Sequence, residues 1–334
     1  MDISIIKDVV CDAYGINIFF VEKNKNVYKL QSKDKTYCLK VINYNLGHFL
    51  FILGAIRHLQ NNGFDKIPDI IKTKSGSNYI CISGKYAYLT DWLNCRQSNY
   101  DNPVDLSIAA SKLAELHVKS EGFRINKNMD PRIGWLKWME TFTTRISEII
   151  DFKERILKKG VKTEFDLLYI KDMSEELDIA DSSIINLYNS DYIYNMKKEI
   201  ARRGFCHHDY AHHNILIDKS GNANVIDFDY CILDSHLHDL SSLMLRRLKN
   251  SKWDLGNAYF IMESYSSIKE VKNSDIPIMA AFMEFPQDYW QLGIQYYWEN
   301  KDWDEEVFIS KLNKIYEDRE EKHEFLHDLR RLKF

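Results

Sequence analysis

The 334-residue sequence has few of the residues that mark disordered, fibrous or repetitive proteins. It contains only 5 Pro and 13 Gly, and it has no internal repeat, low-complexity tract or Pro/Gly/Ser-rich linker. The hydrophobic fraction of 45% and the aromatic fraction of 13% are enough to bury a substantial core. The sequence therefore predicts a globular protein with two domains of ordinary size, or one domain with a large insertion.

Cysteine pairs and long apolar runs are also missing. The six cysteines are scattered without a C-x-x-C pair, which favours reduced, buried thiols over a disulfide framework. The strongest apolar run, Phe49 to Ile56, is too short to span a bilayer. The start of the sequence, MDISIIKDVV, does not resemble a secretory signal, so we expect a cytoplasmic protein with no membrane partner.

An excess of basic residues is absent as well. Lys and Arg together number 45 and Asp and Glu number 49, for a formal net charge of -4. This balance provides no broad attraction to nucleic acid or to an anionic membrane. We therefore expect no nucleic-acid partner.

The first part of the chain is rich in β-type runs. Residues 16–22, 27–31 and 36–42 predict a three-stranded antiparallel meander, and residues 79–83 and 87–90 predict a hairpin. Between them, residues 47–60 carry apolar side chains at helical spacing and are followed by the helix-ending signal Asn61-Asn62-Gly63. These patterns predict a small sheet with one helix, ending near residue 91.

The rest of the chain is mainly helical in pattern. Long helical patterns cover residues 106–118, 135–159 and 181–203, and two short β-type runs lie at 215–218 and 223–227. We therefore expect an α+β fold in which a small antiparallel-sheet lobe at 1–91 is joined by a hinge at 92–95 to a larger helical lobe at 96–334.

The densest polar cluster lies in two segments, FCHHDYAHHNILID at 205–218 and ANVIDFDYCILD at 223–234. Asp227 is flanked by apolar residues, where an unpaired carboxylate would cost several kcal/mol unless a cation compensated it. An Asp carboxylate and an Asn amide oxygen are ligands that Mg²⁺ prefers. Asp209 precedes Asn214 by five positions, so one loop could bring a general base to a substrate hydroxyl and an amide to the metal.

A positive group for phosphate is also present. Lys40, in the β-type run YCLKVI, shares a strand face with Cys38 and Ile42, and a cation on an apolar face needs an anionic partner. A cation, a lysine and a carboxylate base are the parts that phosphoryl transfer from ATP requires. We therefore expect Lys40 to contact phosphate, although a lysine alone is more often a surface residue.

These motifs resemble a known superfamily. The pattern H-x-D-x-x-x-x-N at His207, Asp209 and Asn214, followed by I-D-F-D at 226–229, is similar to the aminoglycoside phosphotransferases and choline kinases, relatives of the protein kinases. Further similarity lies in the strand lysine, in LTDWLNCR at 89–96 and in LAELH at 113–117, so that the resemblance covers roughly residues 5–300. The segments 205–218, 227–246 and 284–303 resemble more closely the CotS-type spore-coat proteins, a kinase-like branch.

The resemblance implies a bilobal protein-kinase-like fold that uses ATP and Mg²⁺ to phosphorylate a hydroxyl of a small-molecule acceptor. It implies Asp209 as the catalytic base, Asn214 and Asp227 as metal ligands with the help of Asp229, Lys40 on the phosphates, and the backbone near Asp91 and Leu93 on adenine. His207 and Asp239 would be architectural. It also implies other spore-coat proteins as partners and deposition in the spore coat.

Two departures from the superfamily leave alternatives open. The helix at 47–60 has no acidic residue to pair with Lys40, and the turn at 22–26 that should cover the phosphates has no glycine. A kinase-shaped structural protein of the spore coat that has lost turnover would share these features. A third interpretation is a metal-dependent hydrolase with a site made from His207, His208, His212, His213, His236, His238 and Asp239.

Overall fold

The computed structural model describes residues 2–334, which form two compact units. The sheet unit comprises the described residues up to Ser98 together with Phe123–Arg132 and His212–Cys231, and the helical unit comprises Asn99–Gly122, Ile133–Ala211 and Ile232–Phe334. Each unit is therefore built from several segments of the chain. The lobe boundaries predicted at residues 91 and 95 stay a prediction.

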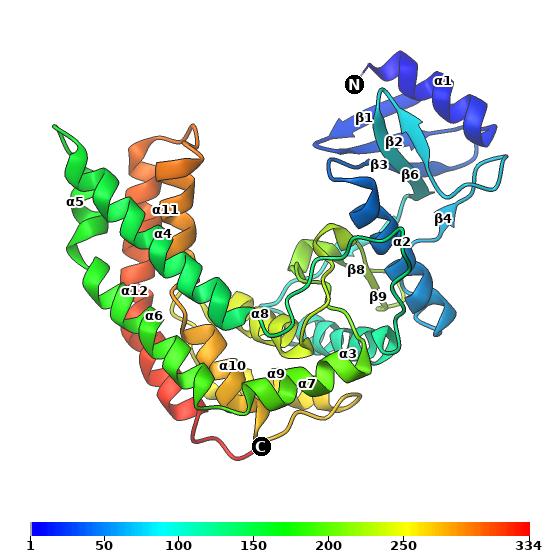
Figure 1. Cartoon of the computed structure of the whole chain (residues 1–334). Coiled ribbons are helices and arrows are strands. Elements are labelled where there is room, and N and C mark those ends of the chain that lie inside the picture. Colours follow the sequence, from blue (N-terminus) through cyan, green and yellow to red (C-terminus); the bar gives the residue numbers. More distant parts are fainter. Residues whose placement is uncertain (1) are drawn as a thin grey trace. The chain divides into compact units, whose positions relative to one another are not determined.

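The sheet unit is built on antiparallel strands. Its elements are α1 (Ile3–Tyr14), β1 (Phe20–Asn24), β2 (Val27–Gln31), β3 (Thr36–Val41), α2 (Leu46–Asn61), β4 (Ile70–Ile71), β5 (Ile80–Ile82) and β6 (Lys85–Asp91). The strand order is β1-β2-β3-β6-β4, with β5 also paired to β6. Helix α1 packs on this sheet through Ile6 and Val10, which share a core with Leu30 and Leu39 (Figure 1).

The predicted meander is confirmed, with a shift of its first strand. Asn24 pairs with Val27, so Lys25 and Asn26 form a two-residue turn that sets the register of β1 against β2. The first strand consequently runs from Phe20 rather than from residue 16. Lys25 adopts a φ of 54°, a backbone conformation that glycine tolerates better than other residues.

A second, smaller sheet belongs to the same unit. It has the order β7-β8-β9, from β7 (Arg96–Gln97), β8 (Ile215–Ile217) and β9 (Ala223–Val225), and short helical turns η1 (His212–Asn214) and η2 (Phe228–Tyr230) flank it. The backbone N–H of Val225 donates to the carbonyl of Lys66 at 2.8 Å. The two motif segments around residues 214 and 227 are thus held in the same unit as Lys40.

The helical unit contains α3 (Pro103–Ser120), α4 (Trp138–Lys158), α5 (Glu164–Lys171), α6 (Met173–Tyr188), α7 (Tyr192–Arg202), α8 (His236–Leu248), α9 (Leu255–Ser266), α10 (Asp275–Glu284), α11 (Gln287–Gly293), the π-helical η3 (Ile294–Trp298) and α12 (Glu305–Leu329). Figure 1 shows α4, α5, α11 and α12 side by side, and the buried aromatic rings of Phe152, Tyr169 and Tyr289 fill the core between them. A small sheet with a helix-rich remainder is the α+β class that the sequence predicts.

One predicted helix is wrong. The pattern at 181–203 is divided between α6 and α7, because α6 ends at Tyr188. Ser190 competes for the backbone: its hydroxyl donates to the carbonyl of Leu187 at 2.7 Å and accepts from the N–H of Tyr192 at 3.2 Å. Such local side-chain bonds replace the helical ones and turn the chain.

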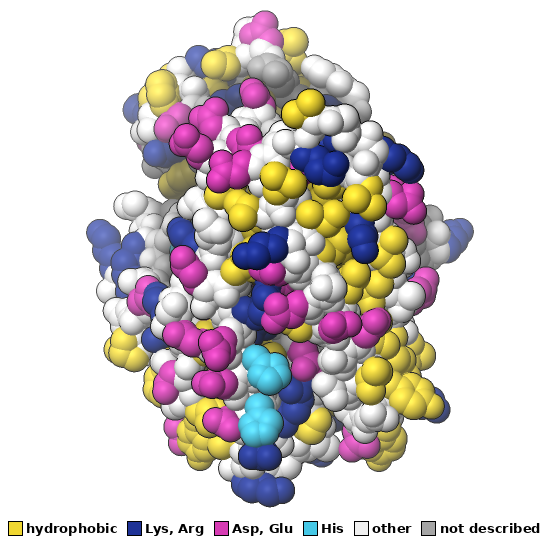
Figure 2. Space-filling view, turned by 90° about the vertical axis from the view of Figure 1, so that its left-hand side faces the viewer, with side chains coloured by type: hydrophobic (Ala, Val, Ile, Leu, Met, Phe, Trp, Pro, Cys, Tyr) yellow, Lys and Arg dark blue, Asp and Glu magenta, His cyan; other side chains and the backbone are white. Residues whose placement is uncertain are grey.

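On the face drawn in Figure 2, acidic and basic side chains are interspersed. This agrees with the small net charge of the sequence. Among residues 2–334, no helix combines the length and the apolar character that crossing a membrane requires.

Candidate active site

Lys40 lies on β3 in the middle of the larger sheet, where it pairs with Val27 on one side and Tyr88 on the other. It is 5% exposed, and its Nζ lies 2.7 Å from Asp227 Oδ1 and 2.6 Å from Asp229 Oδ1. Burial alone would lower the pKa of Lys40, but the electrostatic influence of Tyr88, Asp229 and Asp227 raises it well above its ordinary value. The structure thus brings together a buried ammonium and both acids of the I-D-F-D motif.

Asp229 is an acidic partner for Lys40, which the helix predicted at 47–60 does not supply. Helix α2 has no acidic residue, yet the segment around its start holds Asp229 in place. The hydroxyl of Tyr44 donates to Asp229 Oδ1 at 2.8 Å, and His48 Nε2 lies 3.2 Å from the carbonyl oxygen of Asp229. His48 is itself positioned by the helix cap, because its backbone N–H donates to Asn45 Oδ1 at 2.8 Å.

Asn214 and Asp227 lie at the same end of the β8–β9 hairpin. Ile215 pairs with Val225, and the N–H of Ile226 donates to the carbonyl of Asn214 at 3.0 Å. Asp227 has a φ of 67°, an uncommon conformation for a residue with a side chain. Its side chain is 40% exposed, so an oxygen-seeking cation can reach the carboxylate. A carboxylate and an amide from adjacent backbone positions form a donor set that fits Mg²⁺.

The two residues predicted to lie beside adenine are at the end of β6, where Asp91 is the last residue of the strand and Leu93 lies two residues beyond it. The Asp91 side chain accepts from Lys35 Nζ at 2.7 Å, and the N–H of Trp92 donates to the carbonyl of Thr36 at 3.0 Å. Leu93 makes no hydrogen bond to any of the residues 2–334. Its backbone N–H and carbonyl are therefore available for hydrogen bonds to an adenine edge.

Asp209 belongs to the helical unit, where Arg246 of α8 contacts it. Arg246 Nη2 donates to Asp209 Oδ1 at 2.7 Å, and the N–H of Asp209 donates to His207 Nδ1 at 3.3 Å. The sequence motifs did not point to Arg246, although its place on α8, seven residues after Asp239, puts both on one face of a helix.

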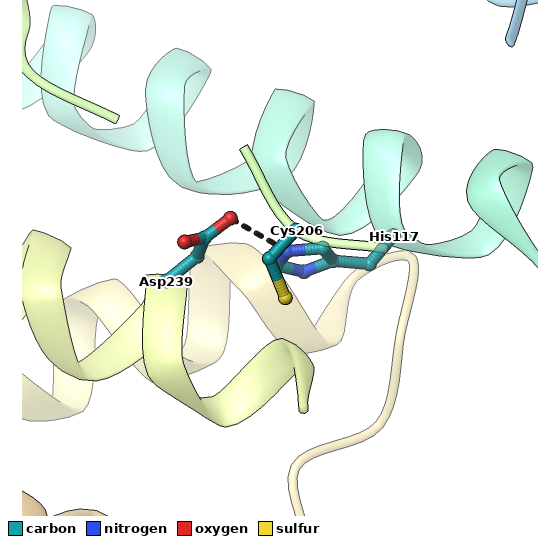
Figure 3. Close-up of side chains that lie close together, drawn as sticks. All are labelled: His117, Cys206 and Asp239. Carbon is teal, nitrogen blue, oxygen red and sulfur yellow. Dashed lines mark hydrogen bonds and ion pairs between the residues drawn. The ribbon is translucent and has the colours of Figure 1, made fainter. Parts of the chain in front are cut away.

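Asp239 anchors the loop that carries Asp209. It is fully buried and accepts the backbone N–H groups of His207 at 2.7 Å and His208 at 2.9 Å. His117 Nε2 lies 3.3 Å from the same carboxylate (Figure 3), and His117 Nδ1 lies 2.7 Å from the Tyr265 hydroxyl. Burial alone would raise the pKa of Asp239, but hydrogen bonds and charge from His117 and His238 hold it well below its usual range.

The predicted histidine-rich metal site is not formed among the described residues. Among residues 2–334, the only set of three close metal-type ligands is His117, Cys206 and Asp239, drawn in Figure 3. Both ring nitrogens of His117 have hydrogen-bond partners, and the Cys206 thiol lies 3.1 Å from the carbonyl of Ser235. The geometry therefore favours a hydrogen-bonded core cluster over the site of a hydrolase.

His117 predicts a measurable dependence of stability on pH. Burial lowers the pKa of His117 to about 4, below its ordinary value of 6.5. Between pH 6.5 and pH 4, His117 is therefore protonated in the unfolded chain but not in the folded protein. Stability from this group is present above pH 6.5 and is lost toward pH 4. Between pH 7 and pH 5, the free energy of unfolding should fall by about 2 kcal/mol more in the wild type than in His117→Gln. Urea titrations at pH 7 and pH 5 measure the free energy of unfolding of both proteins, and an equal decrease in the two would contradict the prediction.

The chain is similar to known kinase-like proteins in sequence and in fold. The sequence matches the family described as "Spore coat putative kinase YutH" over residues 7–329. An aminoglycoside phosphotransferase from Alicyclobacillus acidocaldarius has a TM-score of 0.83 at 22% identity, over 97% of this chain and 95% of that one. Spectinomycin phosphotransferase in complex with ADP and spectinomycin has a TM-score of 0.69 at 16% identity, over 99% of both chains.

A microcompartment-associated aminopropanol kinase has a TM-score of 0.65 at 13% identity, over 98% of this chain and 99% of that one. No curated protein matches the sequence. The predicted resemblance to the spore-coat branch is confirmed by the family match, and the predicted bilobal, protein-kinase-like α+β fold is confirmed by the solved structures. The chain belongs to the YutH family of spore-coat kinase-like proteins.

Proposed function

We propose that the protein is an ATP-dependent phosphotransferase that transfers the γ-phosphoryl group to a hydroxyl of a small-molecule acceptor. The observation that carries the proposal is the buried Lys40 ammonium, paired with Asp227 and Asp229 beside Asn214. A buried lysine held by two acids costs desolvation free energy that a purely structural strand does not need to spend. The cost has a functional reason if these groups bind the phosphates of ATP and a metal cation.

The roles of the residues follow from their chemistry. Mg²⁺, held by Asn214 and Asp227, would neutralise charge on the phosphate oxygens. Lys40 binds phosphate oxygens, Asp229 keeps Lys40 oriented and can assist at the metal, and the backbone at Asp91 and Leu93 binds adenine. Asp209 accepts the proton of the acceptor hydroxyl and aligns it, while Arg246 fixes the position of the Asp209 carboxylate.

Similar proteins support the choice of cofactors. Spectinomycin phosphotransferase has been solved with ADP, and an amicoumacin kinase with AMP-PNP and Ca²⁺. An adenine nucleotide and a divalent cation are therefore reasonable ligands for this chain. The family description names the spore coat, and we infer a place there with other coat proteins as partners.

A catalytically impaired structural protein of the coat is the second candidate. The observation that favours it is the β1–β2 turn, where Lys25 has a φ of 54° and no glycine allows the backbone to approach a phosphate closely. Such a protein would keep the fold and lose nucleotide affinity.

Nucleotide binding separates the two candidates. We expect MgATP to raise the melting temperature of the wild type, because a ligand at about 100 times its Kd stabilises the native state by about 2.7 kcal/mol. Lys40→Met should lose most of this shift, since the phosphates lose their buried cation. Lys85→Met is the matched control: Lys85 lies on β6 of the same sheet, is exposed, and its side chain donates a hydrogen bond to Asn43.

Differential scanning fluorimetry with and without MgATP measures these shifts. A folded wild type with no shift would overturn the phosphotransferase proposal in favour of the structural protein. An equal shift in Lys40→Met and in the wild type would remove Lys40 from the nucleotide site. Release of ADP in the presence of candidate alcohols, followed by a coupled assay, then tests turnover.

A further inference from the structure

The helical unit contains a cavity of about 810 Å³, a volume that suits a small-molecule ligand. Side chains of α4, α6, α8, α10, α11 and α12 line it. His208, from the loop before η1, and Arg246 of α8 also line it, and Arg246 is the residue that contacts Asp209. The cavity is therefore next to the proposed catalytic base within one unit.

Arg145 on α4 has the features of an anion-binding residue. Its guanidinium carbon lies 4.3 Å from the ring centre of Trp290 and 5.9 Å from that of Phe285. Its Nη1 donates to Gln287 Oε1 at 2.5 Å, and no carboxylate in residues 2–334 lies within ion-pair distance of it. Burial lowers the pKa of Arg145 to about 10, against the opposing charge of Glu148, which leaves the group cationic at neutral pH.

A second cation that lines the cavity also has no acidic partner. Lys322 Nζ donates to the carbonyl of Glu284 at 3.5 Å, and no carboxylate in residues 2–334 lies within ion-pair distance of it. Cations without an acidic partner can be satisfied by a ligand rich in acceptor oxygens.

The acids that line the cavity are largely occupied. Glu175 and Glu176 pair with Arg319, Asp288 with Lys249 and Glu284 with Arg330. Asp234 accepts from the Trp138 indole, and Asp318 accepts two backbone N–H groups. Asp178 is exposed to solvent. Among the lysines and arginines that line the cavity, Arg145 and Lys322 have no carboxylate of residues 2–334 within ion-pair distance.

We propose that this cavity binds the acceptor and that the acceptor carries a carboxylate or phosphate group in addition to its hydroxyl. The inference rests on the proposed phosphotransferase function. Arg145 determines specificity by a bidentate contact to the anionic group, with its guanidinium stacked on Trp290. In the reaction, the bond between the γ-phosphorus and the bridging oxygen breaks, the acceptor oxygen forms the new bond, its proton passes to Asp209, and ADP leaves.

Direct binding tests the inference without turnover. Isothermal titration calorimetry of the full chain, with and without MgAMP-PNP, would compare inorganic phosphate, malate and glycerol 3-phosphate with the neutral glycerol and the cationic ethanolamine. We expect at least one of the anions to bind about tenfold or more tightly than glycerol and ethanolamine, because a charge-assisted bond to a desolvated arginine discriminates to this extent.

Three variants assign the effect to Arg145. Arg145→Gln should weaken binding of the anion about tenfold or more, and Arg145→Lys, which keeps the charge without the planar fork, should give an intermediate loss. Arg155→Gln is the matched control, because Arg155 lies on the same helix, pairs with Asp151 and does not line the cavity. Circular dichroism checks that each variant is folded.

Several results would overturn the inference. They are the absence of binding by every anion, tightest binding by ethanolamine, and equal anion affinity in Arg145→Gln and the wild type. These failures are distinct from failure of the proposed function, because that is decided by the MgATP-induced change in melting temperature. A protein that binds MgATP but prefers ethanolamine would be a phosphotransferase with a cationic acceptor.

Discussion

Replacing Asp239 with asparagine should lower the free energy of unfolding by about 3–5 kcal/mol, the cost of breaking a buried, hydrogen-bonded charge network. The carboxylate accepts the N–H groups of both His207 and His208, with one oxygen for each. An asparagine offers one oxygen, and its amide N–H₂ would face a backbone donor. One buried N–H is then left without an acceptor.

Ser241→Ala is the matched control for this effect. Ser241 lies on the same helix, is fully buried, and has a hydroxyl with no hydrogen-bond partner among residues 2–334. Its removal should change stability by only about 0.5 kcal/mol or less. Urea denaturation followed by circular dichroism measures both variants, and a loss below about 1 kcal/mol in Asp239→Asn would show that the network is not essential to the fold.

Much of the fold could be predicted because it depends on local patterns. The antiparallel meander, the helix after it and the helical remainder follow from alternation and helical spacing, which a single sequence displays. The errors lie where local hydrogen bonds and turns replace the regular backbone hydrogen bonds of a helix or strand. Ser190 divides a continuous helical pattern, and the Lys25-Asn26 turn moves the first strand. Periodicity contains no information on such competition.

The candidate site was predicted less completely, for a physical reason. Its acids and lysine belong to recognisable motifs, but the residues that hold them come from distant parts of the chain. Tyr44 meets Asp229 across 185 positions, and neither residue type nor spacing marks that contact. The sequence therefore indicated that Lys40 had no partner in α2. Its partners are Asp227 and Asp229, and Asp229 is held by side chains at the start of that helix.

Asp227→Asn should reduce ATP turnover on the order of 10³-fold, because loss of a metal-binding charge removes electrostatic stabilisation of the transferring phosphoryl group. Asp227 is partly exposed, forms an ion pair with Lys40 and lies at the same end of the β8–β9 hairpin as Asn214, where we propose that it binds the cation. The variant should also need a much higher Mg²⁺ concentration for half-maximal nucleotide binding. A Mg²⁺ titration monitored by nucleotide fluorescence measures this, and an unchanged midpoint would argue against metal ligation by Asp227.

Asp229→Asn should differ from Asp227→Asn in kind. Asp229 contacts Lys40 at 2.6 Å and is engaged by Tyr44, so it acts chiefly as the anchor of the lysine. Its loss should weaken nucleotide binding about tenfold or more, because a hydrogen bond to a charged group contributes about 1.5–3 kcal/mol, while the Mg²⁺ midpoint stays near that of the wild type. Tyr44→Phe should give a smaller loss in the same direction, since only the support of Asp229 is removed. If Asp229→Asn shifted the Mg²⁺ midpoint as strongly as Asp227→Asn, Asp229 would be a metal ligand and Lys40 would depend on Asp227 alone.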